Sequence, residues 1–322
     1  MDAVRVEQLR GGVVEAWHDV HVAVVDASGR LVARTGDPEL TTFWRSAAKP
    51  FQAVPLVEDG VVDRFGLSGE ELALACASHS SEAGQVSRVR ELLTKIGCTE
   101  RDLLCGPHPP LSERVAQDYQ ARGVRLTPVY SNCSGKHAGM LALARHHDWP
   151  TEFYARPEHP VQQRCLAEVS RWTEVPQAVI RTGVDGCGVA CFAVPLRNMA
   201  LAYGKLGSRG QGATPIAAAM LHHPELIAGE GRPCTELMRA HPGRVIAKVG
   251  AEGVYCAALV GEGLGVALKV ADGHALASAL AIAAVLEALG LRPLPSSLGA
   301  RPNLNTRGEP VGELRVNGGL EE

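Results

Sequence analysis

The sequence has no block of basic residues and no strong excess of either charge. Its 32 Lys and Arg residues and 35 Asp and Glu residues give a formal net charge of -3. Surfaces that attract nucleic acids or anionic lipids carry a clear positive excess, so neither a nucleic acid nor a membrane is an expected partner. Hydrophobic residues make up 46% of the chain and charged residues 21%, which is typical of a globular protein.

Long hydrophobic runs are missing as well. The longest, from Ala275 to Leu289, is too short and too rich in alanine to span a bilayer. The residues that follow Met1 contain no apolar segment of the kind that directs secretion. The nine cysteines are an odd number and lack the tight spacing of a disulfide framework. We therefore expect a cytoplasmic protein with mostly reduced thiols.

Internal repeats and low-complexity linkers are also absent, so the order of the remaining patterns indicates the fold. Residues 12–35 and 245–270 are rich in β-branched residues interrupted by turn signals, whereas most segments between them have helical patterns. The two ends are expected to meet in one antiparallel sheet flanked by helices, which is an α/β (α+β) fold with a central helical subdomain. We predict one domain over residues 1–322, with a sheet subdomain at approximately 1–45 plus 243–322 and a helical subdomain at approximately 46–242.

A serine and a lysine three residues apart stand at the boundary between these two parts. Ser46 and Lys49 would lie on the same side of one helical turn, with only alanines between them. At a helix N-terminus the backbone dipole favours negative charge on the serine oxygen, and a neutral lysine can accept the serine proton. Burial and a second nearby cation favour the neutral amine, and Lys248 is the expected cation. An N-capping serine followed by a solvated lysine has the same pattern and remains the alternative.

Six segments together resemble the bacterial-type asparaginases typified by the inducible rhizobial enzyme, the L-asparaginase II family. In chain order they are Arg45–Pro50, Cys76–Ser80, Cys105–His108, Asn132–His137, Asp185–Gly188 and Lys248–Val254. They run from the first sixth of the chain to its last quarter, so the resemblance covers nearly all of it. The S-x-x-K pattern of the first segment is also the first motif of β-lactamases and penicillin-binding proteins. Val249 departs from the Ser or Thr that follows the strand lysine in that superfamily.

The resemblance implies an L-asparaginase, which hydrolyses L-asparagine to L-aspartate and ammonia, with a β-lactamase/penicillin-binding-protein-like fold and a homodimeric assembly. It also implies two serine–lysine pairs, Ser46 with Lys49 and Ser78 with Lys248. Ser46 would form an acyl-enzyme after Lys49 removes its proton. From the residues alone, Ser78 can equally be a buried hydroxyl, Lys248 an edge residue that discourages aggregation, and Ser131 an alternative second hydroxyl.

A metal site, usually occupied by zinc, is the other implication of the resemblance. The implied ligands are Cys133, Lys136 and Cys187, with no organic cofactor. The spacing of the two cysteines does not itself indicate a metal site, since buried thiols are common in cores. Two thiolates can hold zinc, but a lysine ligand must be neutral to take part.

Three further residues are candidates for contacts with the substrate. Arg45 adjoins the nucleophile, His137 follows the expected metal ligands, and Asp185 stands on a tight turn where its carboxylate can bind an ammonium group or form an Asx turn. A pocket one methylene longer would admit glutamine, so a glutaminase or a β-lactam-type serine hydrolase of the same fold is the alternative enzyme. A non-catalytic ligand sensor is the alternative from another class, although the proposed nucleophile and base are both present.

Overall fold

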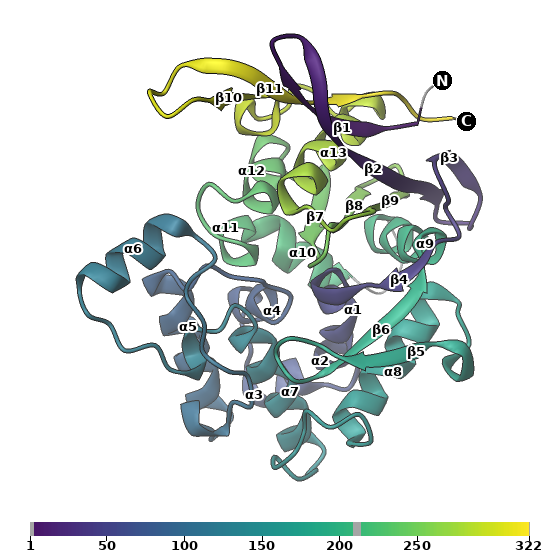
Figure 1. The fold of residues 1–322 in the computed structure, drawn as a ribbon. Coiled ribbons are helices and arrows are strands. Elements are labelled where there is room, and N and C mark those ends of the chain that lie inside the picture. Colours follow the sequence, from purple (N-terminus) through teal and green to yellow (C-terminus); the bar gives the residue numbers. More distant parts are fainter. Residues whose placement is uncertain (1–2, 209–213, 322) are drawn as a thin grey trace. The chain divides into compact units, whose positions relative to one another are not determined.

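The computed structural model describes residues 3–208 and 214–321 (Figure 1). The chain forms two compact units, which are treated separately below. Unit 1 comprises Met1–Ala47, Val194–Arg209 and Glu236–Glu322, and unit 2 comprises Ala48–Ala193 and Gly210–Thr235. The division between Ala47 and Ala48 falls inside the Arg45–Pro50 segment.

Unit 1 is built on an antiparallel sheet in which strands from both ends of the chain are neighbours. The strand order is β10-β11-β1-β2-β9-β8-β7, and β3 also pairs with β2. The bounds are β1 Arg5–Arg10, β2 Val13–Asp26, β3 Leu31–Thr35, β7 Val245–Val249, β8 Val254–Leu259, β9 Leu264–Val270, β10 Arg301–Leu304 and β11 Pro310–Asn317. The first strand lies between β2 and the last strand, with Arg5 opposite both Asp19 and Asn317. The predicted sheet of N- and C-terminal strands is confirmed, and the first and last strands, β1 and β11, lie side by side in Figure 1.

Two helices of unit 1 pack against this sheet, α9 (Leu196–Gly207) and α13 (Ala275–Ala288). The strand segment Val22–Val25 has no exposed residue, and every residue of β8 is buried. Alternate side chains of a strand point to opposite faces, so continuous burial means that both faces of the central sheet are covered. The flanking helices of the predicted α/β fold are therefore present. The remaining elements are β4 (Thr41–Phe43), the 3-10 helices η1 (Arg45–Ala48) and η5 (Ser296–Leu298) and, spanning the division, α12 (Pro233–Ala240).

Unit 2 is mainly helical and is organised around α7 (Ser134–His146). Every residue of α7 from Ser134 to Ala144 is buried, and α2, α3, α4, α5 and α8 all pack against it. The helices are α1 Lys49–Gln52, α2 Val54–Glu58, α3 Val61–Phe65, α4 Gly69–Ala75, α5 Ala83–Lys95, α6 Glu113–Ala121, α8 Pro160–Thr173, α10 Thr214–His222 and α11 Pro224–Ile227. Short 3-10 helices are η2 Glu100–Asp102, η3 Pro128–Tyr130 and η4 Gln177–Val179, and β5 Arg181–Val184 pairs with β6 Ala190–Pro195.

Two prolines divide the helical stretch that follows Ser46. The 3-10 turn η1 gives way to α1 at Lys49, with Pro50 in its first turn, and α1 ends at Gln52. Helix α2 begins at Val54 with Pro55 in its first turn. Proline is tolerated in a first turn but lacks the N–H that a helix interior requires. The structure accordingly has two short helices here, each with a proline in its first turn.

None of the helices in the described parts of the chain is both long and apolar enough to cross a lipid bilayer.

Close packing of α9 on β9 depends on a glycine, and we expect Gly265→Ala to be strongly destabilising. A Cβ at Gly265 would lie 1.9 Å from the Ala200 carbonyl oxygen and 2.3 Å from the Gly204 nitrogen. Because both atoms belong to backbone, the helix would have to move away, and the free energy of unfolding should fall by about 3 kcal/mol or more. Chemical denaturation measures this change. Gly106→Ala is the matched control, since a Cβ there meets nothing within 4 Å; equal losses in both variants would contradict the prediction.

Candidate active site

Side-chain hydrogen bonds within unit 1 fix the residues on both sides of Ser46. The Trp44 side chain is fully buried, and its indole N–H donates to Cys256 Sγ at 3.3 Å. On the other side of Ser46, the Tyr203 hydroxyl from α9 donates to the Ala47 carbonyl oxygen at 2.8 Å. The rings of Trp44 and Tyr203 also meet edge to face, with centroids 6.2 Å apart. Ser46 itself is partly exposed and lies on a turn that is anchored on both sides.

The residue before Ser46 has a strained backbone. Arg45 has a φ of 54°, in the left-handed region that non-glycine residues seldom adopt. Its side chain lies 4.0 Å from the Glu252 carboxylate, and Glu252 has a positive φ of 55° as well. Strain of this kind costs about 1–3 kcal/mol and persists where the surrounding structure enforces it, which is frequent at functional sites.

The strand that carries Lys248 approaches the same segment within unit 1. A Cβ on Gly250 would lie 3.1 Å from the Trp44 carbonyl oxygen, so backbone two residues after Lys248 contacts backbone two residues before Ser46. The Lys248 side chain is fully buried and Nζ donates to the Val249 carbonyl oxygen at 2.9 Å. Unit 1 therefore places Arg45, Ser46 and the Lys248 strand in one region.

In unit 2, Lys49 is fully buried and pairs with Ser78. Lys49 Nζ donates to Ser78 Oγ at 3.0 Å and to the Ala77 carbonyl oxygen at 2.5 Å. The backbone N–H of Ser78 donates to the Ile227 carbonyl at 2.9 Å, which fixes the loop that follows α4. Ser46 lies three residues before Lys49 across the division, and Lys248 belongs to unit 1 while Ser78 belongs to unit 2. The Lys49–Ser78 hydrogen bond is a pairing that the sequence did not predict.

A buried histidine next to Ser78 fixes this loop further. His79 Nδ1 accepts the Ser81 N–H at 3.1 Å, and Nε2 donates to Ser134 Oγ at 2.8 Å. The Ser134 hydroxyl in turn donates to the Val129 carbonyl oxygen at 2.8 Å. Burial lowers the pKa of His79 to about 3, so the ring is neutral and both nitrogens have defined roles. Ser81, with a φ of 60°, is held in the left-handed region by these contacts.

The three residues predicted to bind a metal lie together in unit 2. Cys133 stands at the N-cap position of α7, Lys136 is in the first turn of α7, and Cys187 comes from the turn between β5 and β6. The Cys133 and Cys187 side chains are hydrogen-bonded to each other. Lys136 Nζ lies 3.0 Å from Cys187 Sγ. A fourth group, the Cys105 thiol, interacts with this cluster and with Ser131.

The charges in this cluster are mutually stabilising. The hydrogen bond from Cys133, together with the Lys136 amine, lowers the pKa of Cys187 to about 4, despite burial. The same hydrogen bond, followed by burial, raises the pKa of Cys133 to about 12. Burial opposes the charge on Lys136, but the neighbouring Cys187 and Cys133 raise its pKa above the usual range. The Lys136 amine and the Cys187 sulfur therefore favour each other's charged forms.

The same donor set fits zinc in its chemistry. Two sulfur atoms and one nitrogen atom are donors that zinc accepts, provided that Cys133 and Lys136 release their protons. Within residues 3–208 and 214–321, no group of three or more His, Cys, Asp or Glu side chains is arranged to hold a metal ion. Any zinc at this place would therefore depend on Lys136.

His137 and Asp185, expected to contact the substrate, lie near this cluster. His137 is fully buried, and its Nδ1 is 2.7 Å from the Tyr154 hydroxyl, which accepts the Leu104 N–H. Burial, then Lys136, lowers the pKa of His137 to about 3. Its Nε2 has no hydrogen-bond partner among the described residues. Asp185 Oδ1 accepts the Gly186 N–H at 2.8 Å. One carboxylate oxygen therefore takes part in a hydrogen bond within the turn.

Sequence reasoning missed three residues that the structure brings to these clusters, namely His79, Tyr154 and Cys105. His79 and Cys105 lie inside two of the six family segments, so the resemblance to the family could have indicated both as site residues. Tyr154 has no motif around it, because its role depends on how the loop before α8 folds back onto α7.

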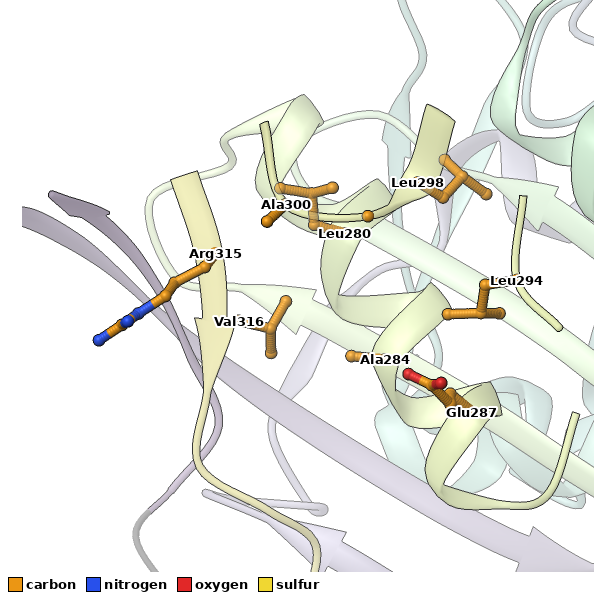
Figure 2. Close-up of a pocket in the computed structure, with 9 residues that line it drawn as sticks. Leu280, Ala284, Glu287, Leu294, Leu298, Ala300, Arg315 and Val316 are labelled. Carbon is orange, nitrogen blue, oxygen red and sulfur yellow. The ribbon is translucent and has the colours of Figure 1, made fainter. Parts of the chain in front are cut away.

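A separate cavity in unit 1 is not a candidate for the reaction. It has a volume of about 220 Å³ and lies between α13, the C-terminal segment and β11 (Figure 2). Leu280, Leu294 and Leu298 supply most of its apolar wall, and its charged lining residues are Glu287 and Arg315. Its lining residues include no Ser, Cys, His or Lys, so they offer neither nucleophile nor base.

The sequence was also compared with known proteins. Among curated proteins, no sequence matches the chain. A putative β-lactamase from Bacteroides dorei DSM 17855 is 15% identical, with a TM-score of 0.40 over 80% of this chain and 88% of that chain. A β-lactamase from Mycobacterium bovis is 16% identical, with a TM-score of 0.41 over 83% and 94%. The native form of Mglu is 17% identical, with a TM-score of 0.38 over 87% and 66%.

These structural likenesses are distant, whereas the family comparison covers almost the whole sequence. The family model for L-asparaginase II matches residues 6–316. That span includes all six recognised segments and every candidate site residue described above. The chain therefore belongs to the L-asparaginase II family of amidohydrolases.

Proposed function

We propose that the protein is an L-asparaginase that hydrolyses L-asparagine to L-aspartate and ammonia, with Ser46 as nucleophile and Lys49 as general base. The observation that carries this proposal is the environment of Lys49. Its amine is fully buried, is fixed by Ser78 and Ala77, and lies three residues from a partly exposed serine on an anchored, strained turn.

The hydrogen bonds of Lys49 suit a base. A neutral lysine amine has two N–H bonds and one lone pair. Ser78 Oγ and the Ala77 carbonyl oxygen accept the two N–H bonds, which leaves the lone pair for a third group. The Ser46 hydroxyl, one helical turn back along the chain, is the proposed proton donor to that lone pair.

The reaction then proceeds by acyl transfer. As Lys49 takes the proton, Ser46 Oγ attacks the side-chain amide carbon, and backbone N–H groups of the turn stabilise the developing oxyanion. The C–N bond breaks, and the proton held by Lys49 passes to the leaving nitrogen, which departs as ammonia. A water molecule, deprotonated by the same amine, attacks the β-aspartyl ester and releases aspartate and free Ser46.

The substrate also carries an α-ammonium and an α-carboxylate, and the chain offers groups for both. Asp185 is the proposed partner of the ammonium group, since its carboxylate is partly exposed. Arg45 and Lys248 are the proposed partners of the carboxylate. His137 has a buried Nε2 that can donate once to a polar group of the substrate or to water.

Zinc is a further part of the proposal. Cys133, Lys136 and Cys187 would hold it, and a bound zinc would supply a fixed positive charge in place of the proton on Lys136. The chain's own residues perform the acyl transfer as described above. Metal analysis of the purified protein, with Cys133→Ala and Cys187→Ala as comparisons, tests this ligand set.

We expect ammonia release from L-asparagine to exceed release from L-glutamine by at least about tenfold in kcat/KM, since one methylene in a fitted pocket is worth about 1–3 kcal/mol. Coupled ammonia assays on both amino acids measure the ratio, and a chromogenic β-lactam is tested beside them. Faster release from glutamine would assign a glutaminase, turnover of the β-lactam alone would assign a β-lactam hydrolase, and inactivity on all three would favour a ligand sensor.

A further inference from the structure

The cavity beside α13 in unit 1 has mainly apolar walls. Three of its lining residues, Leu280, Ala284 and Glu287, recur at the spacing of one helix face. Leu298 from the C-terminal segment and Val316 from β11 contribute to the other sides (Figure 2). Ala284 is the small residue of the helix face, so it leaves a space that a larger side chain would fill.

The size of this cavity suits a small organic group better than water. Its volume is about 220 Å³, whereas an apolar cavity of about 150 Å³ is enough to bind benzene. An ordered water needs about two to four polar partners, and the side chains of Leu280, Leu298 and Val316 offer none. A six-membered ring with a short carbon chain would therefore fit the space and find apolar contacts around it.

The two charged residues that line the cavity differ in direction, and Arg315 points away from it. Arg315 follows Leu314 and precedes Val316 on β11, and alternate side chains of a strand face opposite sides of the sheet. Arg315 Nη2 lies 3.6 Å from Glu7 Oε2 on β1, and Nη1 lies 3.5 Å from Glu313 Oε1. Figure 2 shows the guanidinium directed away from the other labelled residues. The Arg315 charge therefore serves carboxylates of the sheet, and Glu287 is left as the charge that a ligand would meet.

Glu287 stands where the cavity meets an outer hollow. Residues 292–296 line that hollow together with Glu287 and Gly299, so the two spaces have Glu287, Leu294 and Gly299 in common. The Glu287 side chain is 47% exposed, and Arg292, whose Nε lies 3.7 Å from its carboxylate, is 70% exposed. An ion pair this exposed contributes little stability. A cationic group of a ligand can therefore take the place of Arg292 beside Glu287.

We propose that this cavity is a binding site for a small primary amine that carries an apolar group. The apolar group lies between α13 and the C-terminal segment, and the ammonium group lies at Glu287, where the cavity opens to the outer hollow. Removal of the apolar group from water supplies most of the affinity, and the single carboxylate sets the orientation and selects a positive charge. All lining residues belong to unit 1, so the site does not depend on which reaction the protein catalyses.

The experiment titrates the full-length protein with three probes of similar shape and different charge, namely 2-phenylethylamine, 2-phenylethanol and phenylacetate. Isothermal titration calorimetry gives the Kd of each. We expect the amine to saturate with a Kd below about 1 mM, which is within reach of a ligand of this size in a fitted pocket. The alcohol should bind about threefold more weakly, because it lacks the charge that faces a partly exposed carboxylate, and phenylacetate should bind more weakly still. No saturable binding of the amine, or tighter binding of phenylacetate, would overturn the proposal.

Three variants show where the amine binds. Glu287→Gln should remove the preference for the amine over the alcohol and leave the affinity for the alcohol unchanged. Ala284→Phe, which fills the cavity, should abolish binding of both probes. Arg292→Gln is the matched control, because it removes the competing cation and should leave the affinity for the amine equal or higher. Glu287 and Arg292 are partly exposed, so their variants still decide the question if Ala284→Phe fails to fold. An unchanged preference for the amine in Glu287→Gln would place the probe elsewhere and refute the site.

Discussion

Replacing Ser46 with alanine should lower kcat/KM for L-asparagine by about 10³-fold or more, because no acyl-enzyme can form without its oxygen. The free energy of unfolding should change by no more than about 1 kcal/mol, since a partly exposed hydroxyl contributes little to packing. Ammonia assays and chemical denaturation give the two quantities. Mass spectrometry of the native enzyme during turnover should also find an aspartyl adduct on the peptide that contains Ser46.

Ser78→Ala is the matched comparison, because Ser78 is the hydroxyl that Lys49 contacts in unit 2. Removing it takes away one acceptor of the Lys49 amine but not the proposed nucleophile. Activity should fall by about 10²-fold, in the range of a lost proton-transfer partner, and remain above that of Ser46→Ala. If Ser78→Ala were the inactive variant and Ser46→Ala retained activity, Ser78 would be the nucleophile and the proposed roles would be exchanged.

Patterns that depend on neighbours in the chain were predicted well from the sequence. The β-branched ends of the chain form the antiparallel sheet of unit 1, because alternation and turn residues are local properties. The two prolines after Ser46 indicate a helix start or a kink, but not which of the two occurs. Pro50 and Pro55 each fit the first turn of a helix, and only the observed backbone shows that both positions are used in that way.

Contacts made by the fold were predicted less completely. The six family segments supplied the site residues but not their geometry. The hydrogen bond from Lys49 to Ser78 depends on the course of the loop after α4, and the position of Tyr154 beside His137 depends on the loop before α8. Neither loop has a periodic pattern. The zinc ion, the homodimer, the cytoplasmic location and the substrate contacts stay predictions that solution experiments must test.

One short segment connects the two clusters of unit 2. Val129 and Asn132 hold Ser134 and His79 through their carbonyl oxygens, and Cys133 and Lys136 follow directly. The start of α7 therefore supports the Lys49–Ser78 contact and also carries the thiol–amine cluster. A displacement of the backbone at either cluster can therefore shift the other cluster, because both depend on the backbone between positions 129 and 136. Glycine is required at position 135 of this segment, because a Cβ there would be 2.3 Å from the Leu74 carbonyl oxygen.

Acidification should destabilise the protein through His79. Its pKa is about 3 in the folded state, where burial disfavours the imidazolium, and about 6.5 in the unfolded chain. A group whose pKa is lower in the folded state binds a proton more readily in the unfolded state, so acid favours unfolding. The contribution of His79 to the free energy of unfolding is therefore fully present above about pH 6.5 and is lost as the pH falls toward 3. Between pH 7 and pH 5 the linkage amounts to about 2 kcal/mol from this one residue.

The test compares the pH dependence of unfolding between the wild type and His79→Gln. Glutamine can keep a hydrogen bond to Ser134 but does not titrate, so the variant should lose about 2 kcal/mol less than the wild type between pH 7 and pH 5. Its stability at pH 7 can be lower without affecting this difference, because a lost contact costs the same at both pH values. His222→Gln, on the exposed side of α10, should retain the full pH dependence of the wild type. Parallel curves for wild type and His79→Gln would show that His79 is protonated in the folded protein, and the hydrogen-bonding roles assigned to its two nitrogens would then be wrong.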